Sequence, residues 1–339
     1  MHKTLILLCA ATGCAMSEEP DLSTLESGLS VEQWSDGRWV DHAQRSNYQV
    51  GLASFGGRLH MLYRSDNYAG TWGSVNRPWL KWSRFNGSSW SEPVQLDALK
   101  ADYGPSLTVW DDQLVTIYNS YSENRLLMST SRGQEWSTPV TAGTSLGTSR
   151  LTYAPAVVNY RNVLYVAYCK EPAGEGRDQV QVDRFNGYEW TSAATFDIAL
   201  NWKCKSVTAA ALPGPKFRLV WNIHDPRTIG GSQPSWQVYE VSGSAVTGDM
   251  TRAWLPFHSK KPMSLVHCDG VTHLLHGGSS DPEDIRWTAL EDGKWGPSLW
   301  VPGKQSYGGA QAACYNGTRP IMVHNMEDES LLRTSEFLP

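Results

Sequence analysis

Apolar and polar residues alternate over short stretches of this chain, and turn-forming residues separate the stretches. In residues 80–93 (LKWSRFNGSSWSEP), one alternating run ends at Asn86-Gly87 and a second begins near Trp90. Asn-Gly between two such runs is a strong hairpin signal, because both residues tolerate the positive φ angles of a primed turn. The pattern therefore predicts a β-hairpin with a tight turn at Asn86-Gly87.

This hairpin pattern recurs along the sequence. Copies lie at residues 126–139, 180–190 and 285–297, with a fragment at 35–39 and a weaker copy at 236–246. The turn glycines follow one another at intervals of roughly 50 residues, and a period of this length is typical of propellers, solenoids and other repeat arrays. They are Gly37, Gly87, Gly133, Gly187, Gly243 and Gly293.

A second, more apolar hairpin lies between successive copies, so each period contains four candidate strands, A to D. The A–B hairpins lie at residues 51–63, 105–118, 155–168, 206–221, 263–276 and 310–324. The last period ends with a C strand at 331–337, whereas the chain begins with an unpaired D-like strand at 38–42. We therefore predict an all-β fold, a six-bladed β-propeller with four-stranded blades, closed by the N-terminal strand completing the C-terminal blade.

Closure of this kind protects sheet edges that an open array would leave exposed. Five or seven blades would leave the strands at the two ends of the chain unbalanced. A β-sandwich would not explain the period.

The first residues predict export. Lys3 precedes a short apolar run at residues 5–11, which is too short to span a bilayer. The segment Ala11-Thr12-Gly13-Cys14 is similar to a bacterial lipobox, with Cys14 as the acylated residue. We predict a signal peptide at 1–15, a polar tether at 16–29 and the propeller at 30–339. The protein would then be an outer-membrane or cell-surface lipoprotein, or else plainly secreted.

Charge and cysteine content narrow the possibilities further. The 339-residue chain has a net charge of −5, which argues against a general nucleic-acid binder. Four cysteines follow the leader, and an even number in an exported protein permits two disulfides. The strand assignment brings together Cys169 with Cys204, and Cys268 with Cys314, in adjacent blades. We predict these two pairs; four buried thiols are the alternative.

The connections between strands are unequal in length. The A–B and C–D turns are short, whereas the B–C and D–A connections are long, and in a four-stranded meander both long connections emerge at the same end of the sheet. We call this end the long-loop face. Binding residues concentrate in the loops of rigid scaffolds, so the long-loop face is the predicted site.

Two sets of residues recur on this face. The first ends each B strand with an aromatic or imidazole ring, and comprises Tyr63, Tyr118, Tyr168, Trp221, His276 and His324. The second is a basic-x-x-Tyr motif before four A strands, and comprises Arg45 with Tyr48, Lys100 with Tyr103, Arg150 with Tyr153, and Lys304 with Tyr307. Sugar rings stack on aromatic side chains, and cations bind hydroxyl, carboxylate or sulfate groups. The two sets predict several related carbohydrate sites, with packing between blades as the alternative for each set.

The segment STSRGQEW at residues 129–136 resembles the Asp-box, S-x-D-x-G-x-x-W, of sialidase-superfamily propellers, and SRFNGSSW at 83–90 is similar. Ser131 and Phe85 stand in the place of the Asp. The whole repeat also resembles bacterial propeller lectins and BNR-like sugar-binding domains. The resemblance implies a propeller that binds carbohydrate. It also implies an alternative, a sialidase-like glycoside hydrolase or lyase with one central site, although the early Phe/Tyr-Arg-Ile-Pro motif of sialidases is absent.

Other chemistry is weakly represented. His267, Cys268, His273 and His276 lie close together in the sequence, but strand alternation sends His273 and His276 to opposite faces, so we predict no metal site. We assign no catalytic residue and no cofactor. The prediction is an exported, lectin-like propeller that binds a glycan or polysaccharide and meets the membrane only through a lipid anchor. A protein-interaction scaffold at the cell envelope is a further alternative.

Overall fold

The computed structural model describes residues 34–65, 78–121, 123–144, 149–173, 176–199, 202–212, 216–225, 235–244, 249–255, 259, 261–278, 284–306, 308–325 and 331–337. The chain divides into two units, Met1–Ser30 and Val31–Pro339, and only the second contains described residues. The predicted signal peptide, Cys14 and the tether lie outside them, as does Tyr307. Over the described part, no helix is long and apolar enough to cross a membrane.

The second unit consists of antiparallel sheets, which we number by their innermost strands in chain order. Sheet 1 contains β2 (Gly51–Phe55), β3 (Arg58–Arg64), β4 (Trp79–Phe85) and β5 (Val94–Lys100). Sheet 2 contains β6 (Ser106–Trp110), β7 (Gln113–Asn119), β8 (Leu126–Ser131) and β9 (Val140–Ala142). Sheet 3 contains β10 (Arg150–Tyr160), β11 (Val163–Glu171), β12 (Gln179–Phe185) and β13 (Trp190–Asp197).

Three more sheets follow. Sheet 4 contains β14 (Lys203–Leu212), β15 (Lys216–Asp225), β16 (Ser235–Ser244) and β17 (Asp249–Trp254). Sheet 5 contains β18 (Ser264–Cys268), β19 (Val271–Gly277), β20 (Asp284–Glu291), β21 (Lys294–Trp295) and β22 (Leu299–Gln305). Sheet 6 contains β23 (Gln311–Tyr315), β24 (Arg319–Asn325), β25 (Leu332–Glu336) and the N-terminal β1 (Arg38–Trp39), which is followed by a 3-10 turn at Asp41–Ala43.

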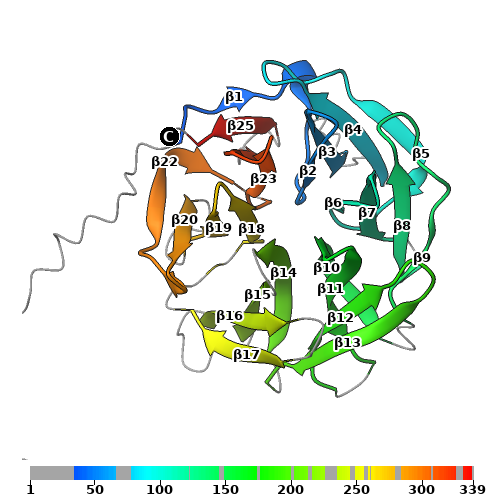
Figure 1. The fold of residues 1–339 in the computed structure, drawn as a ribbon, viewed down its shortest axis with the longest axis vertical. Coiled ribbons are helices and arrows are strands. Elements are labelled where there is room, and N and C mark those ends of the chain that lie inside the picture. Colours follow the sequence, from blue (N-terminus) through cyan, green and yellow to red (C-terminus); the bar gives the residue numbers. More distant parts are fainter. Residues whose placement is uncertain are drawn as a thin grey trace, which may run out of the picture. The chain divides into compact units, whose positions relative to one another are not determined.

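The sheets surround a common centre, with one strand of each innermost (Figure 1). The innermost strands β2, β6, β10, β14, β18 and β23 contact one another in that order, and β23 contacts β2 to complete the circle. The all-β propeller with four-stranded blades is therefore confirmed. Sheet 5 alone has five strands, because β21 and β22 both pair with β20.

The N-terminal strand completes the C-terminal sheet as predicted. Arg38 pairs with Thr334 and Trp39 pairs with Arg333, so β1 becomes the outer strand beside β25. Arg38 also forms an ion pair with Glu336 at 2.9 Å. Residues nearly 300 positions apart thus share one sheet, which leaves β25 without an open edge.

The Asn-Gly turns differ from the prediction. Gly87 has a φ of 100°, but Asn86 does not have a positive φ, so this is not a primed two-residue turn. Instead, the Asn86 side-chain oxygen accepts hydrogen bonds from the backbone N–H groups of Ser88 and Ser89, each at 2.9 Å. Asn is used here as a side-chain cap of a longer turn.

Primed turns lie in the A–B hairpins, where both central residues have positive φ. Asp111 and Asp112 have φ angles of 49° and 52°, and Arg161 and Asn162 have 52° and 61°. Positive φ at both positions matches the right-handed twist of the two strands. The A–B turns lie opposite the long-loop face, and a turn of the same kind, at Asp292-Gly293, joins β20 to β21 in sheet 5.

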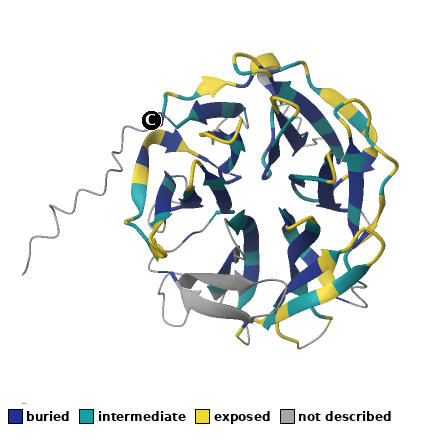
Figure 2. Ribbon diagram, viewed as in Figure 1, coloured by how far each residue is buried: buried dark blue, intermediate teal, exposed yellow. Residues whose placement is uncertain are grey.

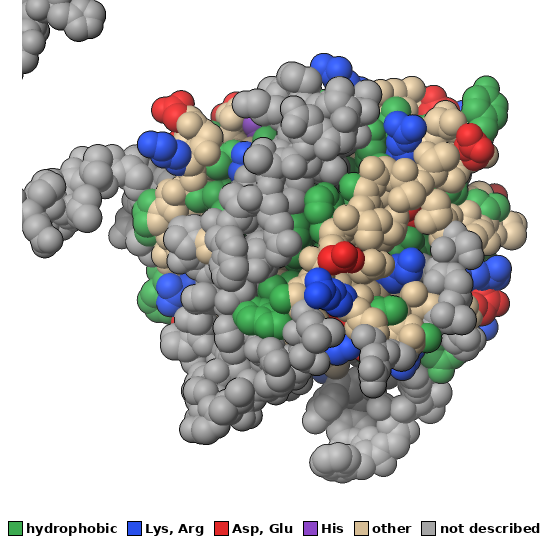
Figure 3. Space-filling view, turned by 90° about the horizontal axis from the view of Figure 1, so that it is seen from below, with side chains coloured by type: hydrophobic (Ala, Val, Ile, Leu, Met, Phe, Trp, Pro, Cys, Tyr) green, Lys and Arg blue, Asp and Glu red, His purple; other side chains and the backbone are tan. Residues whose placement is uncertain are grey.

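The apolar core lies between neighbouring sheets, as the burial pattern shows (Figure 2). One cluster joins sheets 1 and 2 through Leu62, Trp82 and Leu107, and another joins sheets 3 and 4 through Val158 and Leu219. The outer strands β5 and β13 consist of exposed and half-buried residues, except for the buried Leu99. Where the side of the molecule is described, Lys and Arg are interspersed with Asp and Glu (Figure 3). The stability of the unit therefore resides in the junctions between sheets.

Both predicted disulfides are confirmed. Cys169 is bonded to Cys204 across sheets 3 and 4, with Cα atoms 5.7 Å apart. Cys268 is bonded to Cys314 across sheets 5 and 6, with Cα atoms 5.2 Å apart. The first lies at the long-loop face, where β11 ends and β14 begins, and the second lies at the opposite end of its sheets.

Four other sheet junctions carry a hydrogen bond at the long-loop face. In each, the residue after the strand-end ring donates to a backbone carbonyl of the next sheet, which lies before the innermost strand or, for Tyr153, near the start of that strand. The donor–acceptor pairs are Arg64 with Asp102, Asn119 with Tyr153, Asn222 with Ser259 and Asn325 with Ser46. We call these bonds the junction clasps. The equivalent positions in sheets 3 and 5 are Cys169 and Gly277, and these are the two junctions with disulfides.

Candidate functional site

The six strand-end ring residues lie beneath the surface. Each is no more than 3% exposed, and they are Tyr63, Tyr118, Tyr168, Trp221, His276 and His324. Tyr118 belongs to the apolar cluster between sheets 1 and 2, and Trp221 to the cluster between sheets 3 and 4. Large rings at this position fill the gap between neighbouring sheets. Their burial favours the packing interpretation over direct contact with a sugar.

Polar atoms of these rings have internal roles. The Tyr168 hydroxyl donates to the buried carboxylate of Asp183 at 2.8 Å, and Asp183 also accepts from the Thr144 backbone at 2.7 Å. His324 contacts the Gln305 carbonyl oxygen through Nδ1 at 2.9 Å. Burial lowers the pKa of His324 to about 4, so this imidazole is neutral at physiological pH.

The tyrosines of the basic-x-x-Tyr motifs are placed differently. Tyr48, Tyr103 and Tyr153 are half-buried. Tyr48 and Tyr103 precede the innermost strands of sheets 1 and 2, whereas Tyr153 lies within β10, the innermost strand of sheet 3. The Tyr103 and Tyr153 rings are tilted by 35°, with centroids 5.8 Å apart. The Arg64 guanidinium lies 4.3 Å from the centroid of the Tyr48 ring. The structure therefore brings tyrosines of consecutive repeats together at the long-loop face.

The basic residues of the motif do not share one environment. Lys100 and Arg150 are exposed and Arg45 is half-buried, whereas Lys304 is only 5% exposed. Burial lowers the pKa of Lys304, and its ammonium lies 4.0 Å from the Asp36 carboxylate. Lys304 is thus enclosed near sheet 6, and the four motifs are not equivalent copies of one site.

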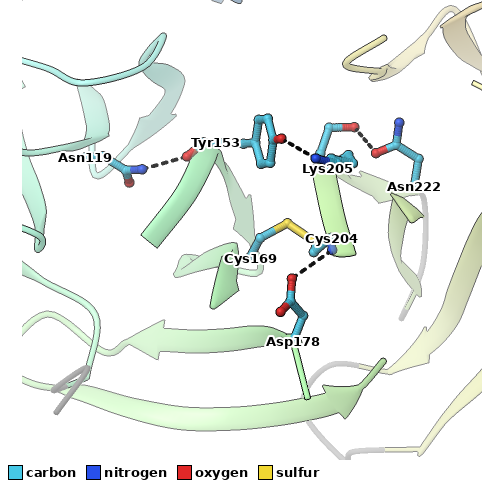
Figure 4. The surroundings of a disulfide bond; sticks show 8 residues. Asn119, Tyr153, Cys169, Asp178, Cys204, Lys205 and Asn222 are labelled. Carbon is cyan, nitrogen blue, oxygen red and sulfur yellow. Dashed lines mark hydrogen bonds between the residues drawn. A yellow bond between two sulfur atoms is a disulfide. The ribbon is translucent and has the colours of Figure 1, made fainter. Parts of the chain in front are cut away.

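Sequence reasoning left Lys205 out of the site, because the motif is broken in the fourth repeat. The Lys205 ammonium donates to the Tyr153 hydroxyl at 2.8 Å and lies 5.3 Å from the centroid of its ring (Figure 4). The only signal available in the sequence was the group of basic residues, Lys203 and Lys205, in front of that A strand. We call Tyr103, Tyr153 and Lys205 the tyrosine–lysine cluster.

Tyr153 has an unusual backbone. Its φ angle is 66°, and the pairing of β10 with β11 shifts register between Thr152 and Ala156. A positive φ is rare for a bulky residue and costs on the order of 1–3 kcal/mol. The Asn119 amide helps to hold this conformation by donating to the Tyr153 carbonyl oxygen at 2.6 Å (Figure 4). Strained residues of this kind concentrate at ligand clamps.

The charges around the cluster suit a polar ligand. Burial, with Tyr153 and Asp102 nearby, raises the pKa of Tyr103, while Arg150 lowers it to a lesser extent. The Tyr103 hydroxyl therefore stays protonated at neutral pH and can donate a hydrogen bond. Among the described residues, no carboxylate lies within 4.0 Å of Lys205 or Arg150. The cluster combines aromatic faces, hydroxyl groups and an ammonium, which are the groups that bind polyhydroxy compounds.

Among the described residues, no three His, Cys, Asp or Glu side chains come together as metal ligands. Cys268, which lies between the histidines of sheet 5, is bonded to Cys314. It cannot act as a thiolate ligand while that bond persists.

No protein-family model and no curated protein matches the chain. Among solved structures, it is similar to the α-L-arabinanase of Penicillium chrysogenum, with 12% identity over 89% of this chain and 98% of that one, and a TM-score of 0.64. The fucose-specific lectin from Aleuria aurantia has 13% identity over 86% and 92%, with a TM-score of 0.54. A Trypanosoma rangeli sialidase has 12% identity over 87% of this chain and 55% of that one, with a TM-score of 0.58.

At these identities the likeness concerns the fold. The expected resemblance to sialidase-like propellers is confirmed at that level, and the chain is a β-propeller whose architecture is similar to those of the arabinanase, the sialidase and the fucose-specific lectin.

Proposed function

We propose that the protein is an exported, six-bladed propeller that binds a glycan or polysaccharide at its long-loop face. The observation that carries this proposal is the tyrosine–lysine cluster, in which Tyr103 and Tyr153 lie against each other beside Lys205. Half-buried tyrosines offer rigid apolar faces for the C–H faces of sugars, and their hydroxyl groups bind sugar hydroxyls. The structural neighbours support the choice of ligand, since the arabinanase is complexed with arabinobiose and the Aleuria protein is a fucose-specific lectin.

The geometry favours one shared site in this part of the face. The rings of Tyr103 and Tyr153, with centroids 5.8 Å apart, are too close to serve two separate sugars. We propose that one oligosaccharide spans both, with Lys205 at one end and Arg150 exposed nearby. The half-buried Tyr48, whose ring lies against the buried Arg64, would extend the surface towards sheet 1.

A sialidase-like glycoside hydrolase or lyase is the second candidate. The same convergence favours it, because an enzyme gathers unlike residues from several sheets at one centre, and here Tyr153 and Lys205 come from sheets 3 and 4. A retaining glycosidase would require two carboxyl groups about 5 Å apart at the bound sugar. Release of reducing sugar from a bound glycan would distinguish the enzyme from a lectin.

Export is supported by the two disulfides, since such bonds persist mainly in oxidising compartments. The leader and the lipid on Cys14 remain part of the proposal. Mass spectrometry of the protein purified from its host would detect an acylated N-terminal Cys14.

A glycan array tests the proposal. The protein is compared with a Tyr103→Ala/Tyr153→Ala double variant and with Tyr188→Ala, whose ring is 94% exposed in the β12–β13 turn. We expect glycan binding by the parent and by Tyr188→Ala, and its loss in the double variant. A folded parent protein that binds no glycan, or a double variant that binds as the parent does, would refute the proposal.

A further inference from the structure

The first three residues of β14 each contact sheet 3. The Lys203 ammonium contacts Glu171 at 2.5 Å and Asp178 at 3.1 Å. Cys204 is bonded to Cys169, and its backbone N–H donates to the Asp178 carboxylate at 3.1 Å. Lys205 then donates to the Tyr153 hydroxyl. Lys205, which belongs to the candidate ligand site, thus directly follows a residue that is disulfide-bonded to sheet 3.

Asp178 is a second anchor at the same point. It is 3% exposed, and its two carboxylate oxygens accept from Lys203 and from the Cys204 backbone. A buried carboxylate with both oxygens engaged fixes its partners in position. The start of β14 is therefore held to sheet 3 by one covalent bond and by one buried carboxylate.

Tyr153, the partner of Lys205, is also held within sheet 3. Thr152, which directly precedes Tyr153, is paired with Cys169 in the β10–β11 ladder. Cys169 is therefore the register partner of the strained segment of β10 and also the covalent partner of β14. The disulfide links β14, which bears Lys205, to β11, the strand paired with the segment of β10 that bears Tyr153 (Figure 4).

The repeats show what the disulfide replaces. In sheets 1, 2, 4 and 6 the position of Cys169 is occupied by the Arg or Asn of a junction clasp. A clasp is a single hydrogen bond to a backbone carbonyl of the next sheet. A disulfide instead fixes the Cα atom of Cys204, one residue before Lys205, at 5.7 Å from that of Cys169.

We propose that the Cys169–Cys204 disulfide, together with Asp178, is a positioning element that sets the Lys205 ammonium on Tyr153. The ligand-binding consequence rests on the proposed function. Cys268–Cys314 supplies a matched control within the same chain, because it also joins adjacent sheets but lies at the opposite end of them. The first bond shapes the site, and the second only holds two sheets together.

The test compares Cys169→Ser/Cys204→Ser with Cys268→Ser/Cys314→Ser. NMR spectra are recorded on protein with ¹³C-labelled tyrosine rings, and the Tyr153 resonances are identified as those that disappear in Tyr153→Phe. Binding is measured separately, with the glycan that the array identifies. We expect both variants to unfold at lower temperature, but only the first to shift the Tyr153 resonances. The glycan affinity of Cys169→Ser/Cys204→Ser should fall about tenfold, which is the effect expected when one charge-assisted hydrogen bond is lost.

Unchanged Tyr153 resonances in Cys169→Ser/Cys204→Ser would overturn the proposal, as would equal shifts in the two disulfide variants. If the first variant does not fold, Asp178→Asn takes its place and should shift the same resonances in the same direction. The resonances are read without any sugar. Shifted Tyr153 signals in a protein that binds no glycan would therefore support the positioning role while contradicting the proposed function.

Discussion

The Asn119 junction clasp gives a sharp prediction, because it ends on the strained residue of the candidate site. Asn119 is 2% exposed, and its amide donates to the Tyr153 carbonyl oxygen. In Asn119→Ala this partly buried carbonyl loses its donor, which costs about 1–3 kcal/mol. Tyr153 also loses a contact that holds its φ at 66°. A relaxation to negative φ would recover part of that free energy, but it would turn the ring away from Lys205.

We therefore expect two separable effects of Asn119→Ala. The free energy of unfolding, measured in urea, should fall by about 1–2 kcal/mol, because the release of backbone strain offsets part of the lost hydrogen bond. Glycan affinity should fall by about tenfold or more, since the aromatic surface is no longer in place.

Asn325→Ala is the matched control. Asn325 forms the equivalent clasp with the Ser46 carbonyl oxygen at 2.8 Å and is equally buried. It also accepts hydrogen bonds from Ser306 and from the backbone of Gly308, so its loss should lower stability at least as much. It has no bond to Tyr153, and affinity should stay within about twofold of the parent value. Equal losses of affinity in the two variants would refute the assignment of a special role to Asn119.

Three further outcomes follow from the packing between sheets. His60, His273 and His324 are buried, and burial lowers the pKa of each from 6.5 to about 4. The unfolded chain therefore binds more protons than the folded protein below pH 6.5. The free energy of unfolding should be at its full value above pH 6.5 and should fall towards pH 4, by up to about 1.4 kcal/mol per pH unit for each histidine. Urea unfolding at a series of pH values checks this, and a flat profile between pH 7 and 4.5 would contradict it. Gly104→Ala should lower the free energy of unfolding by about 1–3 kcal/mol or more, because the added Cβ would collide with the Gln49 carbonyl oxygen of the neighbouring sheet. Gly56→Ala, with no atom within 4 Å of the added methyl group, should cost about 1–2 kcal/mol through its positive φ alone. Similar melting temperatures for the two variants would be inconsistent with the collision at Gly104. Thiol titration of the unfolded, unreduced protein should find none of Cys169, Cys204, Cys268 and Cys314 free, and reactive thiols at these positions would contradict the bonds.

The features that sequence reasoning predicted are those that a repeat makes visible. The period, the strand alternation and the unpaired strands at the two ends led to the propeller and to its closure by β1. The strand assignment alone was also enough to pair Cys169 with Cys204. Each of these depends on counting strands, and strand order is carried by local alternation of apolar and polar residues.

The errors arose where one residue type has several uses. Asn86 was read as a positive-φ residue, but it acts through its side chain as a cap. Tyr118 and its counterparts recur for packing as readily as for binding, and only burial separates the two. Recurrence in duplicated units therefore does not distinguish core from site.

Lys205 was missed because its contact depends on the bulge in β10 and on the approach of two sheets. Neither follows from the periodicity of one strand. Tyr153, which belongs to a recurrent motif, was predicted, but its positive φ was not. The unusual backbone is what distinguishes it from Tyr48 and Tyr103.

Glycan affinity of single tyrosine variants tests the central claim most directly. Titration calorimetry with one glycan from the array would compare Tyr103→Ala and Tyr153→Ala with Tyr188→Ala. We expect each of the first two to lower the affinity by about tenfold or more, because aromatic contacts at the centre of a site are lost, and the third to leave the affinity unchanged. Parent-like affinity in both Tyr103→Ala and Tyr153→Ala would contradict it and would move the search for a ligand to another part of the propeller.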